Sequence, residues 1–123
     1  MHRFSRALAL LALALTAACS TQPVDGEWNG EWSVDPTTGP LDVTLVQEGT
    51  ALSGKVNAGS SMCWTDGTVK GTITGDDVLF GVLMSNGAEL DFKGTVSVGS
   101  MTGTFKDRTG CTAAGGDWTI SRK

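Results

Sequence analysis

Apolar and polar residues alternate with a period of two from Trp28 to the C-terminus, and no stretch repeats with a helical period. Residues that favour turns recur about every eight to twelve positions, as expected for short antiparallel strands. The pattern predicts eight strands, over residues 27–34, 41–48, 50–57, 67–74, 78–85, 88–98, 100–107 and 116–122. The connections include Asn86-Gly87, which is typical of a hairpin, and Asp35-Pro36 together with Gly39-Pro40.

Four of the predicted strands share one local pattern: apolar, polar, glycine, Lys or Thr, apolar. The repeats are Leu52–Val56, Val69–Ile73, Phe92–Val96 and Met101–Phe105. Because side chains alternate between the two faces of a strand, each glycine lies on the same face as its apolar neighbours. Glycine on an inner face allows backbone and opposing groups to approach closely, which a narrow, tightly curled sheet requires.

Trp28, Trp32 and Trp118 share the phase of this inner face. Eight meandering strands with an aromatic interior favour an all-β, up-and-down antiparallel barrel, because closure leaves no strand edge exposed. A sandwich of two sheets is the alternative.

The first residues of the chain have the pattern of an export signal. Met1–Arg6 contains two arginines and no acid, and Ala7–Leu15 is entirely Ala and Leu. Nine apolar residues rise only about 14 Å as a helix, less than half of a hydrocarbon core, so a signal peptide is expected rather than a membrane span.

The sequence Leu15-Thr16-Ala17-Ala18-Cys19 resembles the lipobox of bacterial lipoproteins, with Thr16 in place of the usual leucine. The resemblance implies cleavage before Cys19, a lipid on that cysteine and attachment to a membrane of the cell envelope, facing the periplasm or the exterior. In a host with an outer membrane, Ser20 favours that membrane. Ordinary cleavage near Ala18, without lipid, is the alternative. The expected organisation is a signal peptide (1–18), a tether (19–25) and a barrel domain (26–123).

Three cysteines in an exported chain leave one unpaired, and lipidation of Cys19 accounts for it. We expect Cys63 and Cys111 to form a disulfide, since thiols oxidise outside the cytoplasm. Closing a loop of this length stabilises a fold by about 4 kcal/mol. Two free thiols are the alternative.

Gly26-Glu27-Trp28 and Gly30-Glu31-Trp32 each resemble the Gly-x-Trp that opens the first strand of lipocalins and avidins, the calycin-type barrels. The resemblance implies an eight-stranded barrel. Avidins also imply biotin binding through side chains that include tyrosine, but this chain has no tyrosine. Lipocalins imply a cup for a small apolar molecule, whereas the inner positions here are dense with large apolar side chains.

Composition excludes several kinds of function. After removal of residues 1–18, seven basic residues face 13 acidic ones, a formal charge of −6, so nucleic acid is not an expected partner. The only histidine, His2, leaves with the signal peptide, which removes histidine-dependent catalysis and metal binding. We expect no catalytic residue, no metal and no cofactor.

Two carboxylate pairs bear on this expectation. Glu89 and Asp91 lie two residues apart on one strand face, a spacing compatible with acid–base chemistry, but Lys93 continues the same row and favours a solvated outer face. Asp76-Asp77 offers oxygen ligands for calcium without the spacing of a known calcium loop, so a turn is favoured.

The candidate binding residues are Met62, Trp64 and Arg108, in two loops that a Cys63–Cys111 bond would hold together. Binding residues concentrate on loops held by a rigid scaffold, and Trp and Arg are frequent interface anchors. The alternative is that Trp64 packs over the disulfide and caps the barrel. The sequence thus predicts a lipid-anchored, non-enzymatic binding or structural barrel, with any protein partner bound at these two loops; the alternative is a lipocalin-like carrier of a small apolar ligand.

Overall fold

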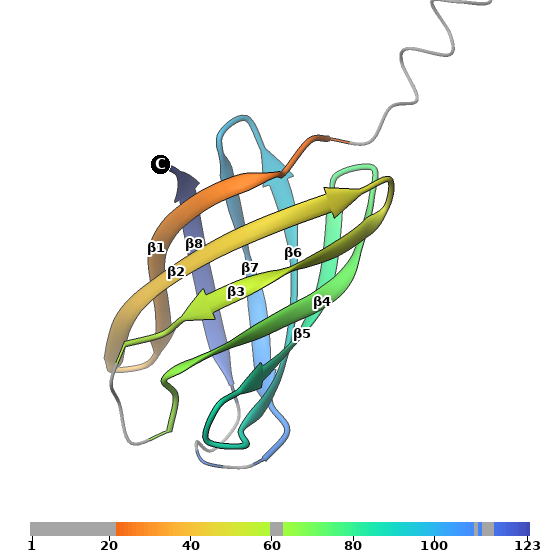
Figure 1. Cartoon of the computed structure of the whole chain (residues 1–123). Helices are drawn as coiled ribbons and strands as arrows, with labels where there is room; N and C mark the ends of the chain where they lie inside the picture. Colours follow the sequence, from red (N-terminus) through yellow and green to blue (C-terminus); the bar gives the residue numbers. More distant parts are fainter. Residues whose placement is uncertain (1–21, 60–62, 110, 112–114) are drawn as a thin grey trace, which may run out of the picture.

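The computed structural model describes residues 22–59, 63–109, 111 and 115–123. The strands are β1 (Gly26–Val34), β2 (Thr37–Glu48), β3 (Ala51–Asn57), β4 (Asp66–Thr74), β5 (Asp77–Met84), β6 (Glu89–Ser97), β7 (Ser100–Asp107) and β8 (Gly116–Arg122). Each strand pairs antiparallel with the next, and β8 pairs with β1 to close the barrel (Figure 1). The predicted up-and-down barrel is confirmed, and the two-sheet sandwich is wrong.

The inside of the barrel is filled by large apolar side chains. The aromatic residues predicted for the inner face are all buried, each at most 6% exposed: Trp28, Trp32, Phe80, Phe92, Phe105 and Trp118. Strand register places Phe80, Phe92 and Phe105 in one row, with stacked rings at centroid distances of 5.1 and 5.2 Å. Trp118 meets two of these rings edge-on. None of the described polar residues is buried, so the interior is an apolar core.

The inner-face glycines lie where the backbones of neighbouring strands approach most closely. A Cβ added to Gly103 would lie 1.9 Å from the carbonyl oxygen of Lys93, and one on Gly71 would lie 2.1 Å from that of Leu79. Any larger residue would force these strands apart. The repeated glycine therefore serves the tight curl of the sheet, as its phase predicts.

β2 begins earlier than the sequence predicts, because Gly39 and Pro40 lie inside the strand rather than in the connection. The reason is the packing of Trp32 from the paired strand. Its indole lies over Gly39, where a Cβ would be 2.3 Å from the Trp32 ring. Pro40 pairs with Glu31 in the same ladder, and the connection itself shrinks to Asp35-Pro36.

The barrel has two ends that are built differently. The end we call the terminal end carries residues 22–25, the C-terminus and the turns at 49–50, 75–76 and 98–99. The end we call the disulfide end carries the connections 35–36, 58–65, 85–88 and 108–115. Figure 1 shows the N-terminal segment and the C-terminus leaving from the same end.

Candidate functional site

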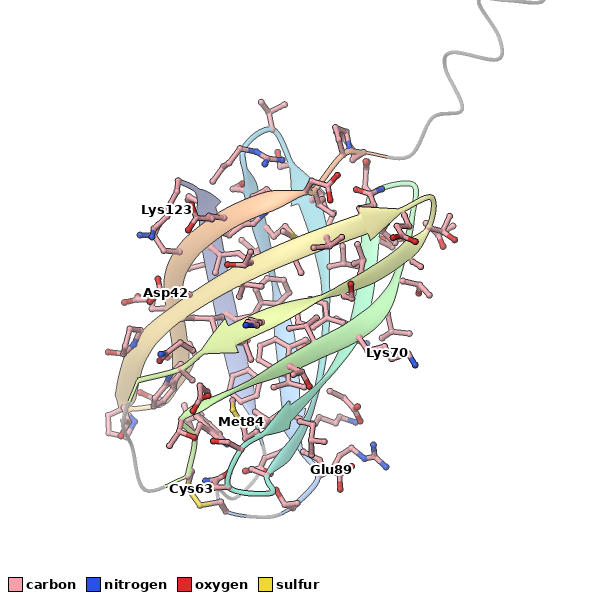
Figure 2. All side chains as sticks on the ribbon, in the orientation of Figure 1. Asp42, Cys63, Lys70, Met84, Glu89 and Lys123 are labelled. Carbon is pink, nitrogen blue, oxygen red and sulfur yellow. A yellow bond between two sulfur atoms is a disulfide. The ribbon has the colours of Figure 1, made fainter. Side chains whose placement is uncertain are left out.

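A disulfide joins two connections at the disulfide end. Cys63, between β3 and β4, is bonded to Cys111, between β7 and β8, with a Cα–Cα distance of 5.6 Å. The predicted pair is confirmed, and the alternative of two free thiols is wrong. In Figure 2 Cys63 lies at the tip of this end. The bond links strands on different sides of the barrel and so fixes the two loops relative to each other.

Trp64, predicted as a candidate binding residue, lies inside the disulfide end of the barrel. Its side chain is 1% exposed, and its ring meets Trp32 at 4.7 Å and Phe105 at 5.4 Å, both edge-on. Its Nε1 donates a hydrogen bond to a carboxylate oxygen of Asp107 at 3.3 Å. The indole is therefore not presented to a partner, and the alternative that Trp64 caps the barrel is the arrangement found. Met62 lies outside the described residues.

Arg108 is exposed at the same end and contacts two acids of β6. Its guanidinium lies 4.0 Å from a carboxylate oxygen of Glu89 and 3.6 Å from one of Asp91, and all three side chains are more than half exposed. Ion pairs this open to solvent contribute little to stability. Glu89 and Asp91 thus occupy a solvated outer face beside a cation, which is the arrangement that Lys93 indicated in the sequence.

Polar groups also gather around the loops of the disulfide end. The side-chain amide of Asn86 donates to the Cys63 carbonyl at 3.0 Å, and the Ser85 hydroxyl donates to Asp66 at 3.0 Å. The Thr109 hydroxyl donates to Asp107 at 2.7 Å. The first two contacts join the β5–β6 connection to Cys63 and to the start of β4. Among the described residues, no three His, Cys, Asp or Glu side chains gather closely enough to hold a metal ion.

The terminal end is closed by the two ends of the described chain. Val24, in the segment predicted as tether, is fully buried, and its carbonyl accepts a hydrogen bond from Trp28 Nε1 at 3.0 Å. The Arg122 guanidinium lies 4.4 Å over the Trp28 ring and donates to the carbonyls of Asp25 and Pro23, at 2.6 and 3.0 Å. Residues 22–25, in the segment predicted as tether, therefore pack against the terminal end of the barrel. Cys19 lies outside the described residues.

The outer surface carries a feature that sequence reasoning missed. Leu79 and Leu83 of β5 point outward and are 59% and 56% exposed. Between them lies Gly81, which leaves a groove of about 600 Å³ across β4 to β7. We call this surface the Leu79 face, defined by the outward residues Lys70, Leu79, Gly81, Leu83, Asp91, Lys93 and Lys106. The sequence does contain a signal for this surface. Gly81 lies between the apolar Phe80 and Val82 and so belongs to the outer face, whereas the glycines of the four repeats lie on the inner face.

Charge is distributed unevenly around the barrel. The outer face of β8, β1 and β2 carries exposed acids: Glu27, Glu31, Asp42, Glu48 and Asp117. The Leu79 face, across the barrel, carries three lysines. Figure 2 shows Asp42 and Lys70 on opposite sides of the molecule. Any partner drawn by charge therefore meets two different surfaces.

Known protein families, curated proteins and solved structures contain no match to this chain. No helix among the described residues has the length and apolar character needed to cross a membrane.

Proposed function

We propose that the protein is a lipoprotein of the cell envelope, anchored through a lipid on Cys19, whose barrel is a non-enzymatic binding or structural module. The observation that carries this proposal is the filled interior. Because the described core is apolar and closed by side chains at both ends, the surface of the barrel is what remains for contact with other molecules.

The filling of the core favours this function over a lipocalin-like carrier. A carrier needs a cavity of several hundred Å³ that is lined by apolar groups and reachable from outside. Here Trp64 occupies the disulfide end, and Val24 occupies the terminal end. The inner aromatic rings lie 4.7 to 5.8 Å from their ring neighbours, which is contact distance. The groove on the Leu79 face is outside the barrel.

The position of Gln22 supports a defined orientation on the membrane. Three residue steps separate it from Cys19, and an extended chain spans at most about 11 Å over that length. Gln22 lies at the terminal end, where its backbone N–H donates to the carbonyl of Gly75 at 3.4 Å. A lipid on Cys19 would therefore hold the terminal end at the bilayer. The disulfide end, with its hydrogen-bonded loops, would lie farther from the bilayer and offer the surface for a protein partner.

Metabolic labelling tests the anchor. Cells that express the full chain are grown with radioactive palmitate, and the protein is recovered from the membrane fraction. Labelled protein is expected from the wild type, and none from Cys19→Ala. The double variant Cys63→Ser, Cys111→Ser is the matched control, because it removes the other two cysteines and is expected to keep the label. Globomycin should cause the uncleaved precursor to accumulate. Processing that is insensitive to globomycin, with no label on the wild type, would refute the anchor.

A further inference from the structure

Gly81 has no structural reason to be glycine. Its φ is not positive, and a Cβ built on it would find no heavy atom closer than 3.9 Å. Every other described glycine either has a positive φ or would bring a Cβ within 3.0 Å of a neighbour. Glycine in the middle of a strand weakens it relative to residues that prefer extended backbone. The fold thus tolerates an unfavourable residue at position 81. Because Gly81 has no side chain, a groove is open there.

The side chains around Gly81 combine apolar and basic character. Leu79 and Leu83 flank it along β5, and Lys70 and Asp91 flank it on the neighbouring strands. Lys106 pairs with Asp91 one strand further on, but the Asp91 carboxylate contacts Arg108. Across the described residues, the ammonium groups of Lys70, Lys93 and Lys106 form no salt bridge. Three lysines that form no salt bridge therefore line the groove, and its one acidic lining residue, Asp91, is paired with Arg108.

Apolar side chains interleaved with lysines are typical of surfaces that rest in the interfacial region of a bilayer. The acids Asp76 and Asp77 lie at the β4–β5 turn, on the rim beside this face.

The first described residue, Gln22, lies next to this same surface. It contacts Gly75 of the β4–β5 turn and the Gln47 side chain of β2. Figure 1 shows the first described residues at the end of the barrel that carries the β4–β5 turn. A lipid on Cys19, three residue steps from Gln22, would lie within about 11 Å of this point and would bring the bilayer within reach of the β4–β5 side.

We infer that the Leu79 face is a membrane-docking surface, which lays the anchored barrel against a bilayer containing anionic phospholipids. The lysines contact the phosphate groups, Leu79 and Leu83 enter the interfacial layer, and the groove at Gly81 accommodates a headgroup. The inference rests on the proposed lipid anchor. In this orientation the barrel lies on its β4–β7 side instead of standing upright on the terminal end. The acidic face of β8, β1 and β2 is then turned to the solvent.

The test uses the lipidated protein, purified from membranes and reconstituted into vesicles of phosphatidylcholine alone or mixed with phosphatidylglycerol. Flotation of the protein with both kinds of vesicle reports the anchor. A water-soluble acetylating reagent then reports the exposure of each lysine, read by peptide mass spectrometry. We expect Lys70, Lys93 and Lys106 to react about fivefold more slowly on the mixed vesicles. The attraction of one lysine to an anionic surface favours the bound form about fivefold, and a bound amine is shielded from the reagent. Lys55, which lies beside Glu27 and Asp42 of the acidic face, should react equally on both.

Two variants separate docking from folding. Gly81→Thr fills the groove with a residue that fits the available space, so we expect unchanged or higher thermal stability and loss of most of the protection. Leu79→Glu should abolish the protection. Its matched control is Thr119→Glu, which adds the same charge to an exposed position on β8 and should leave the protection intact.

The failures are distinguishable. Protein that floats with neither vesicle refutes the lipid anchor, and the docking with it, because the tether no longer places the face at the bilayer. Protein that floats with both vesicles but shows equal lysine reactivity refutes the docking alone. Slowing of acetylation by soluble glycerophosphoglycerol to the same extent would assign the groove to a free anion and would also refute the membrane contact.

Discussion

The two ends of the barrel are closed by different means. At the disulfide end, one indole from a loop fills the opening, and a covalent bond between two connections holds that loop in place. At the terminal end, the closure uses both termini of the described chain, with Val24 as the apolar plug and Arg122 bridging to Pro23 and Asp25. One end thus depends on a large buried surface and a covalent link, the other on hydrogen bonds and a cation over a ring.

The difference implies an uneven distribution of stability. Buried aromatic area and loop closure each contribute several kcal/mol, whereas hydrogen bonds from an exposed guanidinium contribute less. We therefore expect the disulfide end to be the more resistant one and the terminal end to open first.

The largest effect is expected from Trp64→Ala. Removal of the indole deletes its contacts with Trp32 and Phe105 and leaves a cavity, so the free energy of unfolding should fall by up to about 5 kcal/mol. Denaturant unfolding followed by tryptophan fluorescence measures it. A loss of less than about 1 kcal/mol would mean that the disulfide end is not held by this side chain.

The double variant Cys63→Ser, Cys111→Ser should lower the free energy of unfolding by about 4 kcal/mol, because the cross-link spans 48 residues of sequence and restricts the unfolded chain. The same measurement on the wild type with and without reductant provides the control. Equal stability of oxidised and reduced protein would contradict the assigned role of the bond.

At the terminal end, Arg122→Ala should cost about 1 to 2 kcal/mol, since it removes a cation over Trp28 and two hydrogen bonds to backbone carbonyls. Hydrogen exchange should show faster exchange in β1 and β8 near this end and no change at β4 and β5. Lys123→Ala is the matched control. A loss of unfolding free energy as large as that for Trp64→Ala would contradict the proposed difference in stability between the two ends.

The smallest effect is expected from Arg108→Ala. Its two ion pairs are exposed and long, so the free energy of unfolding should change by about 0.5 kcal/mol or less. Thermal unfolding of this variant, compared with that of Trp64→Ala, separates the contribution of the surface ion pairs at the disulfide end from the contribution of its core. A large loss for Arg108→Ala would show that the ion pairs are structural.

Strand number, barrel closure and inner face could be predicted from the sequence because alternation and turn residues are local signals. The start of β2 could not, because Gly39 and Pro40 are strand residues only where Trp32 packs across them. The burial of Val24 could not be predicted for a related reason. Val24 lies outside the periodic segments, and only the completed barrel offers the opening that it fills. Trp64 caps the barrel, which is one of the two roles that the sequence left open for it.

The candidate site was predicted in part. Pairing of Cys63 with Cys111 followed from counting cysteines, and the exposure of Arg108 followed from its place in a loop. The Leu79 face was missed because 78–84 is almost continuously apolar. Such a run does not show which side chains point outward until its register with β4 and β6 is known.

The central claim is that the barrel works through its outer surface and holds no interior ligand. The most direct measurement is a titration of the purified protein with the apolar fluorophore N-phenyl-1-naphthylamine, followed by energy transfer from the buried tryptophans. Trp64→Ala, in which a vacated apolar space is expected to accept such a probe, serves as the positive control. The account predicts no saturable binding to the wild type. Saturable binding of one probe per wild-type barrel, with efficient transfer from the interior, would contradict it.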